Sequence, residues 1–298
     1  MPEKVIECVP NFSIGKDPSS AELIVSAMRS AGPSVVIADH SFDLDHGRLV
    51  VTLFGEGSDL KESVYQGIKK AVETIDIRKH EGEHPCMGVA DVIPFIPIKR
   101  ATFNDCVRLR NELSEKIASQ LNVPVYIYGN IAKRPERNEL HFVRRGGIKG
   151  VGSRICTVEG RPDFGPSRLH PTAGAVAVGA RDILIAFNIN LNKGSLEDAK
   201  AIAASVREKN GGLKGVRAIG LYLESRKTAQ VSLNIVNYRA SSIKTVFDAV
   251  KAEAAKRSLS VQDCEIIGLI PKDASFEGMQ AYLKLKDWDG SRVIENYL

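Results

Sequence analysis

Residues 183–191 read ILIAFNINL. The second half of this run alternates apolar and polar side chains, which is typical of a strand with one buried face. Ser195 and Asp198 follow with the spacing of a capping box, so we expect a helix to begin there. Apolar residues then recur at helical intervals. The stretch therefore predicts a strand followed by an amphipathic helix.

The residues that follow predict two further strands, a second helix and a closing strand. Two strand-like runs, 216–223 and 230–237, are separated by a charged turn. Ser242 begins a second helix with its apolar residues on one face, and residues 265–270 form a closing strand. The order of elements is βαββαβ, which is that of a split-βαβ or ferredoxin-like unit.

The N-terminal half shows this order less cleanly. The expected elements are a strand over 5–12, a helix over 20–31, strands over 35–39 and 49–54, a helix over 61–75, a strand over 89–98, a helix over 104–121 and a strand over 125–128. Residues 146–179 are rich in Gly and Pro and poor in periodicity, as a domain boundary or a binding loop would be. We predict an α+β fold of two ferredoxin-like (βαββαβ) subdomains, 1–178 and 179–298, with facing sheets and a cleft or tunnel between them.

Composition narrows the class of protein. The chain is 43% apolar and 26% charged, which is ordinary for a globular protein, and no apolar run approaches the ~18 residues of a membrane span. Five scattered cysteines without a C-x-x-C pair indicate reduced thiols in the cytoplasm. A formal charge of +5 with 6% aromatic residues and one Trp argues against nucleic-acid binding.

Histidines gather in one part of the chain. Four of the six lie within 45 residues, among several carboxylates: His40, His46, His80 and His84. Such a concentration of titratable groups indicates a site, although structural roles for these side chains are equally consistent with the pattern.

The stretch 80–84, HEGEH, matches the zinc-protease pattern H-E-x-x-H. That pattern binds zinc only on a helix, where both histidines share a face. Gly82 lies inside the pair and Pro85 follows it, so we expect a loop and no metal. Dinucleotide and P-loop signatures are absent. Residues 165–174, GPSRLHPTAG, are either a linker or a loop that cradles a carboxylate-bearing ligand.

Taken together, these segments resemble the glutamate formiminotransferase family along nearly the whole chain. The matching motifs are Glu7-Cys8-Val9-Pro10-Asn11-Phe12-Ser13, Asp45-His46 with Arg48, Gly82-Glu83-His84-Pro85 with Met87-Gly88, Pro94-Phe95-Ile96-Pro97, Pro162-Asp163-Phe164-Gly165-Pro166, His170-Pro171-Thr172-Ala173-Gly174-Ala175, Val178-Gly179-Ala180-Arg181, Ala186-Phe187-Asn188 with Asn190-Leu191, and Ala229-Gln230-Val231-Ser232.

The resemblance implies a homodimeric enzyme that transfers the formimino group of N-formimino-L-glutamate to tetrahydrofolate and requires no metal. It implies that His84 is the catalytic residue. The folate-binding residues that it implies are Gly165, Pro166, Ser167, Arg168, Leu169, His170, Pro171, Thr172, Ala173, Gly174 and Gln230.

The chemistry suits these residue types. One imidazole can take the proton that N5 of the pterin loses and return it to the departing glutamate nitrogen, because its pKa lies near working pH. Supporting roles are expected for Asp39, His46, Arg48 and Glu83: carboxylates would hold the cationic amidine, and Arg48 or Arg168 would bind substrate carboxylates.

Three residues depart from the family pattern beside the expected site. Ile14 replaces Glu, Gly47 replaces Asn and Cys86 replaces Arg. Because these changes alter the charge available to a dicarboxylate substrate, two alternatives stay open. One is folate-dependent formyl transfer with 5-formyltetrahydrofolate, and the other is folate binding without turnover.

Overall fold

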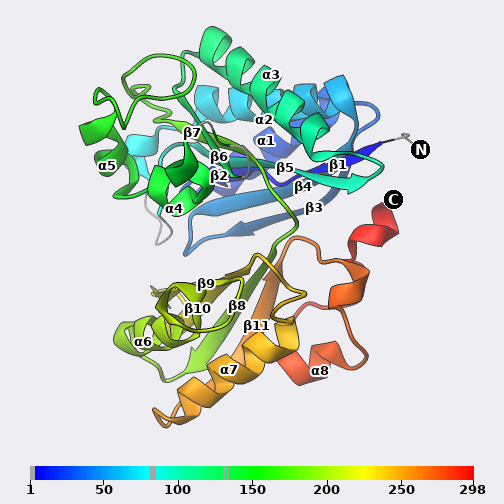
Figure 1. The fold of residues 1–298 in the computed structure, drawn as a ribbon, viewed down its shortest axis with the longest axis vertical. Coiled ribbons are helices and arrows are strands. Elements are labelled where there is room, and N and C mark those ends of the chain that lie inside the picture. Colours follow the sequence, from blue (N-terminus) through cyan, green and yellow to red (C-terminus); the bar gives the residue numbers. More distant parts are fainter. Residues whose placement is uncertain (1–3, 81–84, 130–131, 133) are drawn as a thin grey trace. The chain divides into compact units, whose positions relative to one another are not determined.

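The computed structural model describes residues 4–80, 85–129, 132 and 134–298. The chain divides into two units, Met1–Arg181 and Asp182–Leu298, each with its own sheet (Figure 1). The division expected after residue 178 falls within strand β7, Val176–Ala180, which pairs with strands of the first unit. The mixed α+β class with two sheets is as predicted.

The second unit has the order βαββαβ. Its elements are β8 (Ile185–Asn192), α6 (Leu196–Val206), β9 (Val216–Leu223), β10 (Thr228–Ile235), α7 (Ile243–Ala255) and β11 (Ser260–Ile267), followed by the short α8 (Met279–Leu283). The strands lie in the order β11-β8-β10-β9, and all neighbours are antiparallel. The capping box at Ser195 and the helix start at Ser242 are confirmed.

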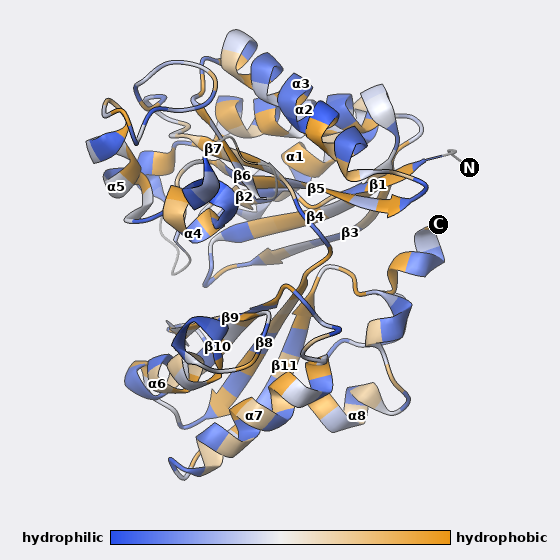
Figure 2. Ribbon diagram, in the orientation of Figure 1, coloured by the Kyte–Doolittle hydropathy of each residue, from blue (hydrophilic) through white to orange (hydrophobic). Residues whose placement is uncertain are grey.

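Alternation along these strands gives the second sheet one apolar and one polar face. Ile185, Phe187 and Ile189 of β8 are buried in a core with α6 and α7, whose residues are hydrophobic on one side and hydrophilic on the other (Figure 2). The intervening Asn188 and Asn190 therefore lie on the opposite face of the sheet.

The first unit is larger. Its elements are β1 (Val5–Cys8), β2 (Asn11–Ser13), α1 (Pro18–Ala31), β3 (Val36–Asp43), β4 (Arg48–Gly55), α2 (Gly57–Thr74), β5 (Ala90–Lys99), α3 (Phe103–Leu121), β6 (Val125–Gly129), α4 (Leu140–Val143), α5 (Gly147–Arg154) and β7. The single strand expected over 5–12 is two strands, β1 and β2, which both pair with β4 and β5.

The sheet of this unit continues beyond β5 through two parallel pairings, β5 with β7 and β7 with β6. Helices α1, α2 and α3 cover one face, while α4 and α5 cover the other face at the β6–β7 end (Figure 1). Residues 146–179 were expected to lack regular structure, yet they contain α5 and β7. Within the described ranges, no helix combines the length and hydropathy of a transmembrane span.

Candidate active site

Three backbone hydrogen bonds join residues 172–175 to the two stretches that flank residues 81–84. They run from Ile77 N to Thr172 O (2.8 Å), from Val89 N to Ala173 O (3.0 Å) and from Ala175 N to Met87 O (2.9 Å). The expected catalytic residue His84 and its neighbour Glu83 lie outside the described residues. Both flanks of their stretch are nevertheless tied to the end of the expected folate segment.

This junction depends on two glycines. Gly174 has a φ of +72°, and a Cβ there would lie 2.5 Å from the Met87 carbonyl oxygen. Gly88 is as tightly enclosed, since its Cβ would lie 2.1 Å from Ala175 O. Only residues without a side chain allow the two backbones to approach this closely.

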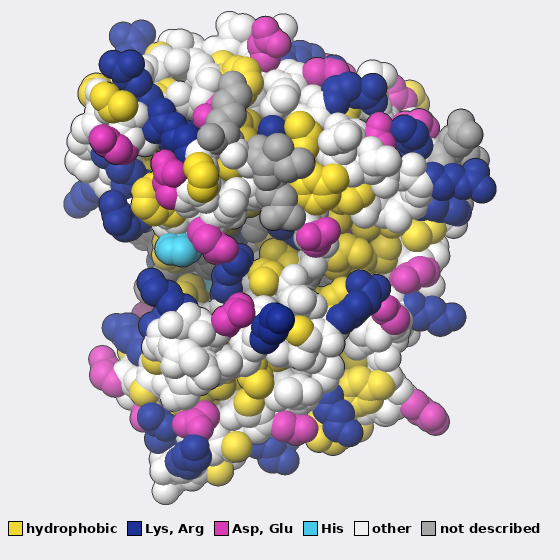
Figure 3. Space-filling view, in the orientation of Figure 1, with side chains coloured by type: hydrophobic (Ala, Val, Ile, Leu, Met, Phe, Trp, Pro, Cys, Tyr) yellow, Lys and Arg dark blue, Asp and Glu magenta, His cyan; other side chains and the backbone are white. Residues whose placement is uncertain are grey.

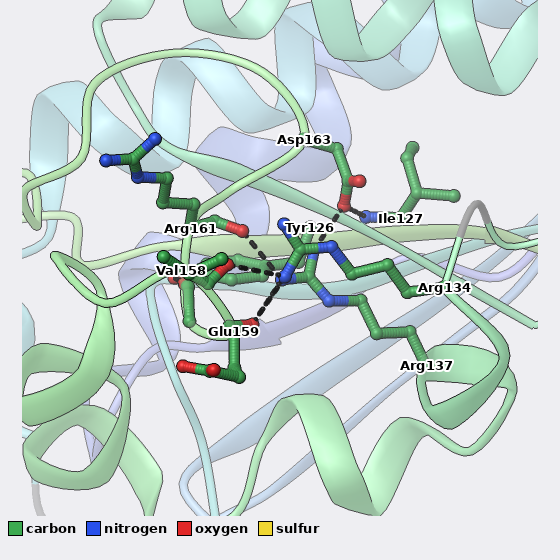
Figure 4. A network of polar contacts seen from close by, with 9 residues as sticks. Tyr126, Ile127, Arg134, Arg137, Val158, Glu159, Arg161 and Asp163 are labelled. Carbon is green, nitrogen blue, oxygen red and sulfur yellow. Dashed lines mark hydrogen bonds and ion pairs between the residues drawn. The ribbon is translucent and has the colours of Figure 1, made fainter.

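A network of side chains fixes the loop that leads into the expected folate segment (Figure 4). Arg134, Tyr126 and the buried Arg137 donate hydrogen bonds to the four consecutive carbonyls of residues 158–161, at 2.6–3.0 Å. Arg137 also pairs with Asp163 at 2.6 Å, and the same carboxylate oxygen accepts the Ile127 N–H at 2.8 Å. The loop is therefore anchored to β6 before residue 165.

Within the expected folate segment, His170 has a defined protonation state. Its Nδ1 accepts backbone N–H groups from Thr172 (3.3 Å) and Ala173 (3.0 Å), so the ring is neutral with its proton on Nε2. Burial lowers the pKa of His170, in agreement with that state. The side chain shapes the turn and keeps one N–H donor on its other nitrogen.

The remaining residues of the segment differ in exposure. Ser167 and Arg168 are exposed, and Leu169 packs on the smaller core beneath α4 and α5. The exposed Cys156 donates its thiol hydrogen to Ser167 O at 3.2 Å.

An ion cluster lies on the face of the sheet opposite α1–α3. Asp91 is fully buried, and its Oδ2 accepts hydrogen bonds from Arg48 (2.8 Å) and Arg144 (2.7 Å). Its Oδ1 accepts the Met87 N–H at 2.8 Å, and Arg48 also donates to Asn11 at 2.9 Å. We call Arg48, Asp91 and Arg144 the Asp91 cluster.

Opposing effects set the charge of this cluster. Burial raises the pKa of Asp91, but Arg144, Arg48 and the Met87 N–H outweigh it and lower that pKa below its usual value. Burial lowers the pKa of Arg48, and Asp91 opposes that change. The cluster thus keeps one carboxylate between two guanidinium groups.

Two further side chains border the cluster. Burial and the charge of Asp91 raise the pKa of the Cys86 thiol, to which the Ser13 hydroxyl is hydrogen-bonded. His80 has both ring nitrogens buried without a hydrogen-bond partner in the part of the chain that the structure describes. Burial and the charge of Arg48 lower the pKa of His80, so its imidazole is neutral at neutral pH.

The three departures from the family pattern lie at this end of the sheet. The Ile14 N–H donates to Gly47 O at 2.9 Å, and Cys86 is held by Ser13, the residue before Ile14. Gly47 directly precedes Arg48. Ile14 is buried in the core of the first unit.

The other expected supporting residues are more distant. His46 is buried in the turn before β4, where its backbone N–H donates to Asp43. Asp39 pairs with Thr52, roughly 13 Å along β4 from Arg48 at ~3.3 Å per residue. Gln230 belongs to the second unit, where its fully buried amide donates to Asn190 at 2.9 Å.

Sequence reasoning assigned no role to Asp91 or Arg144, and it noted His80 only as one of the four clustered histidines and as part of the H-E-x-x-H match. Asp91 occupies a β-bulge in β5, since Asn11 pairs with Val92 and Phe12 with Ala90. The bulge inserts one residue and turns this carboxylate toward Arg48. The adjacent pair Arg144-Arg145 was a visible signal, and Figure 3 shows Lys and Arg side chains gathered over the α5 region.

Across the described residues, no group of His, Cys, Asp and Glu side chains is arranged to hold a metal ion. That statement does not extend to His84. The expectation that the chain needs no metal stays a prediction.

Family comparisons agree with this arrangement. A model of the formiminotransferase domain, N-terminal subdomain, matches residues 5–181, and a formiminotransferase domain model matches residues 186–292. The chain belongs to the formiminotransferase family.

Its relatives include two proteins of similar length. It is 40% identical to a glutamate formimidoyltransferase of Streptococcus pyogenes serotype M1, covering 99% of both chains. It is 38% identical to a glutamate formimidoyltransferase of Thermoplasma acidophilum, covering 98% of this chain and 96% of that one. It is also 37% identical to the formimidoyltransferase-cyclodeaminase of Rattus norvegicus, over 94% of this chain and 52% of the relative.

Proposed function

We propose that this chain is a glutamate formimidoyltransferase that moves the formimino group of N-formimino-L-glutamate to N5 of tetrahydrofolate. The full-length relatives carry this name. The observation that supports it best is the set of backbone hydrogen bonds between residues 172–175 and both flanks of residues 81–84. These bonds tie the end of the proposed folate segment to residues on both sides of the stretch that contains the proposed catalytic histidine.

In the proposed reaction, N5 attacks the amidine carbon and the bond to the glutamate nitrogen breaks. His84 takes the proton that N5 loses and gives a proton to the departing nitrogen, so the products are 5-formiminotetrahydrofolate and glutamate. No net proton is consumed by the enzyme. A neutral imidazole suits both steps, because its ordinary pKa lies near working pH.

The remaining assignments are part of the same proposal. The segment Gly165–Gly174 and Gln230 bind the folate, while Asp39, His46, Arg48 and Glu83 support the amino-acid substrate. Each unit is a ferredoxin-like subdomain, and the substrates use a tunnel between facing sheets. We further propose that the protein acts as a cytoplasmic homodimer without a metal or a nucleic-acid partner.

The test is transfer by the purified full chain from N-formimino-L-glutamate to tetrahydrofolate. We expect glutamate and 5-formiminotetrahydrofolate in equal amounts. A chain that binds tetrahydrofolate but transfers only a formyl group from 5-formyltetrahydrofolate, or transfers nothing, would refute the proposal.

A further inference from the structure

Arg144 has hydrogen-bonding capacity that the described residues do not use. Its side chain is 17% exposed, and its guanidinium donates one hydrogen bond, to the Asp91 carboxylate at 2.7 Å. A guanidinium carries five N–H donors. Both oxygens of Asp91 are already engaged, Oδ2 by Arg48 and Arg144 and Oδ1 by the Met87 N–H. A mostly buried cation with spare donors calls for a second anion.

His80 presents the same kind of deficit beside the same cluster. The charges of Arg48 and Asp91 both act on its imidazole, and its two buried ring nitrogens have no partner within the described residues. Buried polar atoms in native proteins are almost always hydrogen-bonded. A buried imidazole without a partner among the described residues, close enough to Arg48 and Asp91 to be affected by their charges, therefore indicates a missing ligand.

We propose that Arg144 and His80, bordering Asp91, form a subsite that binds a carboxylate of a substrate. The inference rests on the proposed function, in which both substrates carry carboxylates. It assigns to Arg144 a binding role that the sequence pattern gave to Arg48 or Arg168.

The chemistry of the ligand follows from the donors. The planar fork of Arg144 matches a carboxylate, and the neutral imidazole of His80 adds one N–H. The hydrogen bond to Asp91 already restricts the Arg144 side chain, so little side-chain entropy is lost on binding. Arg48 is hydrogen-bonded to Asn11 and Asp91, which leaves Arg144 as the more available fork.

The experiment compares the wild-type chain with Arg144→Met and His80→Ala, using steady-state kinetics with each substrate varied in turn. For Arg144→Met we expect KM for one substrate to rise about 10- to 100-fold, as for a lost charge-assisted hydrogen bond, with kcat within about threefold. His80→Ala should raise the same KM by a smaller factor. A rise for N-formimino-L-glutamate identifies its carboxylate as the ligand, and a rise for tetrahydrofolate identifies the glutamyl tail.

Controls separate binding from folding. Arg108→Met removes an arginine that is 63% exposed and far from this cluster in the fold, and it should leave both KM values unchanged. Arg144→Lys should recover part of the affinity, and thermal melting checks that each variant is folded. Unchanged KM values for both substrates in folded Arg144→Met would overturn the inference.

If the wild-type chain transfers no formimino group, calorimetric titration with L-glutamate and with tetrahydrofolate still tests the subsite. Weaker binding of either compound by Arg144→Met would then support it, while equal binding of both would sink it. The binding titration therefore tests the subsite independently of the proposed function.

Discussion

At Asp91, a single inserted residue decides the electrostatics of one end of the first sheet. The bulge turns the carboxylate to the face where Arg48 and Arg144 reach it. The strand was expected from its apolar residues, but a bulge depends on pairing with a strand almost 80 positions earlier in the chain. The residues that the sequence missed here are those placed by such long-range contacts.

The residue with the sharpest expected effect on catalysis is His84. We expect His84→Ala to lower the single-turnover rate by ~10²–10⁴, because one positioned acid–base group contributes that much. The folate dissociation constant should stay nearly unchanged, since the backbone hydrogen bonds that hold residues 172–175 run to Ile77, Met87 and Val89, which the substitution leaves in place. Rapid-quench kinetics and calorimetry measure the two quantities. A variant that loses folate binding but turns over normally at saturation would make His84 a binding residue.

Glu7 gives the protein a pH-dependent weakness. Burial raises its pKa from 4.5 to about 7, and Arg181 only partly opposes this. The unfolded carboxyl ionises near 4.5, so stability is full below that pH and is lost as the pH rises through 7. We expect Glu7→Gln to gain about 3 kcal/mol of unfolding free energy relative to the wild type between about pH 4 and about pH 8. Urea unfolding of both proteins across this pH range measures the difference. If the two unfolding free energies changed with pH in the same way, the prediction would be wrong.

At the scale of elements, local signals served well. Ser195 with Asp198, and Ser242, begin helices as predicted because a cap needs only residues within one turn. β7 was missed because its small residues, VAVGA, become a strand only between two parallel partners that are distant in the chain. The junction between residues 172–175 and the flanks of residues 81–84 was not predicted either, because no local sequence pattern indicates hydrogen bonds between distant segments.

Gly174 is the position where that junction can be tested. Gly174→Ala adds a Cβ 2.5 Å from Met87 O, on a backbone with φ +72°. We expect a loss of about 1–3 kcal/mol in stability and a raised KM for tetrahydrofolate, because the proposed folate segment must move away from Met87. Thermal melting and kinetics measure the two effects.

Gly278→Ala is the matched control, since Gly278 has the same φ of +72° but no atom within 4 Å of its added Cβ. Gly278→Ala should lose only the stability that a positive φ costs a residue with a side chain, and its KM for tetrahydrofolate should be unchanged. Equal effects of the two variants would show that strain, rather than the junction, explains the result.

At the scale of the whole molecule, the chain has separate hydrophobic cores. The core that contains Phe187 and Phe247 draws only on residues of the second unit, and that unit has a complete four-stranded sheet. This division agrees with the two family domains that match in succession.

We therefore expect residues 182–298 to fold when produced alone, with a cooperative thermal transition. The fragment should have no transfer activity, because His84 and residues 165–174 are absent from it. Circular dichroism and amide exchange test the first statement. A fragment without protected amides in β8 and β10 would show that the second core depends on the first unit.

The hydrogen bond from Cys156 to Ser167 offers an optical reporter on the proposed folate segment. The other four cysteines are buried, so a thiol-reactive dye should label Cys156 first in the native protein. Because the acceptor carbonyl belongs to the segment, tetrahydrofolate should slow labelling, and the attached dye should change its emission as the segment is occupied. Mass spectrometry locates the label, and Cys156→Ser supplies the blank. If saturating tetrahydrofolate left the labelling rate of Cys156 unchanged, ligand binding would not affect the segment at Ser167.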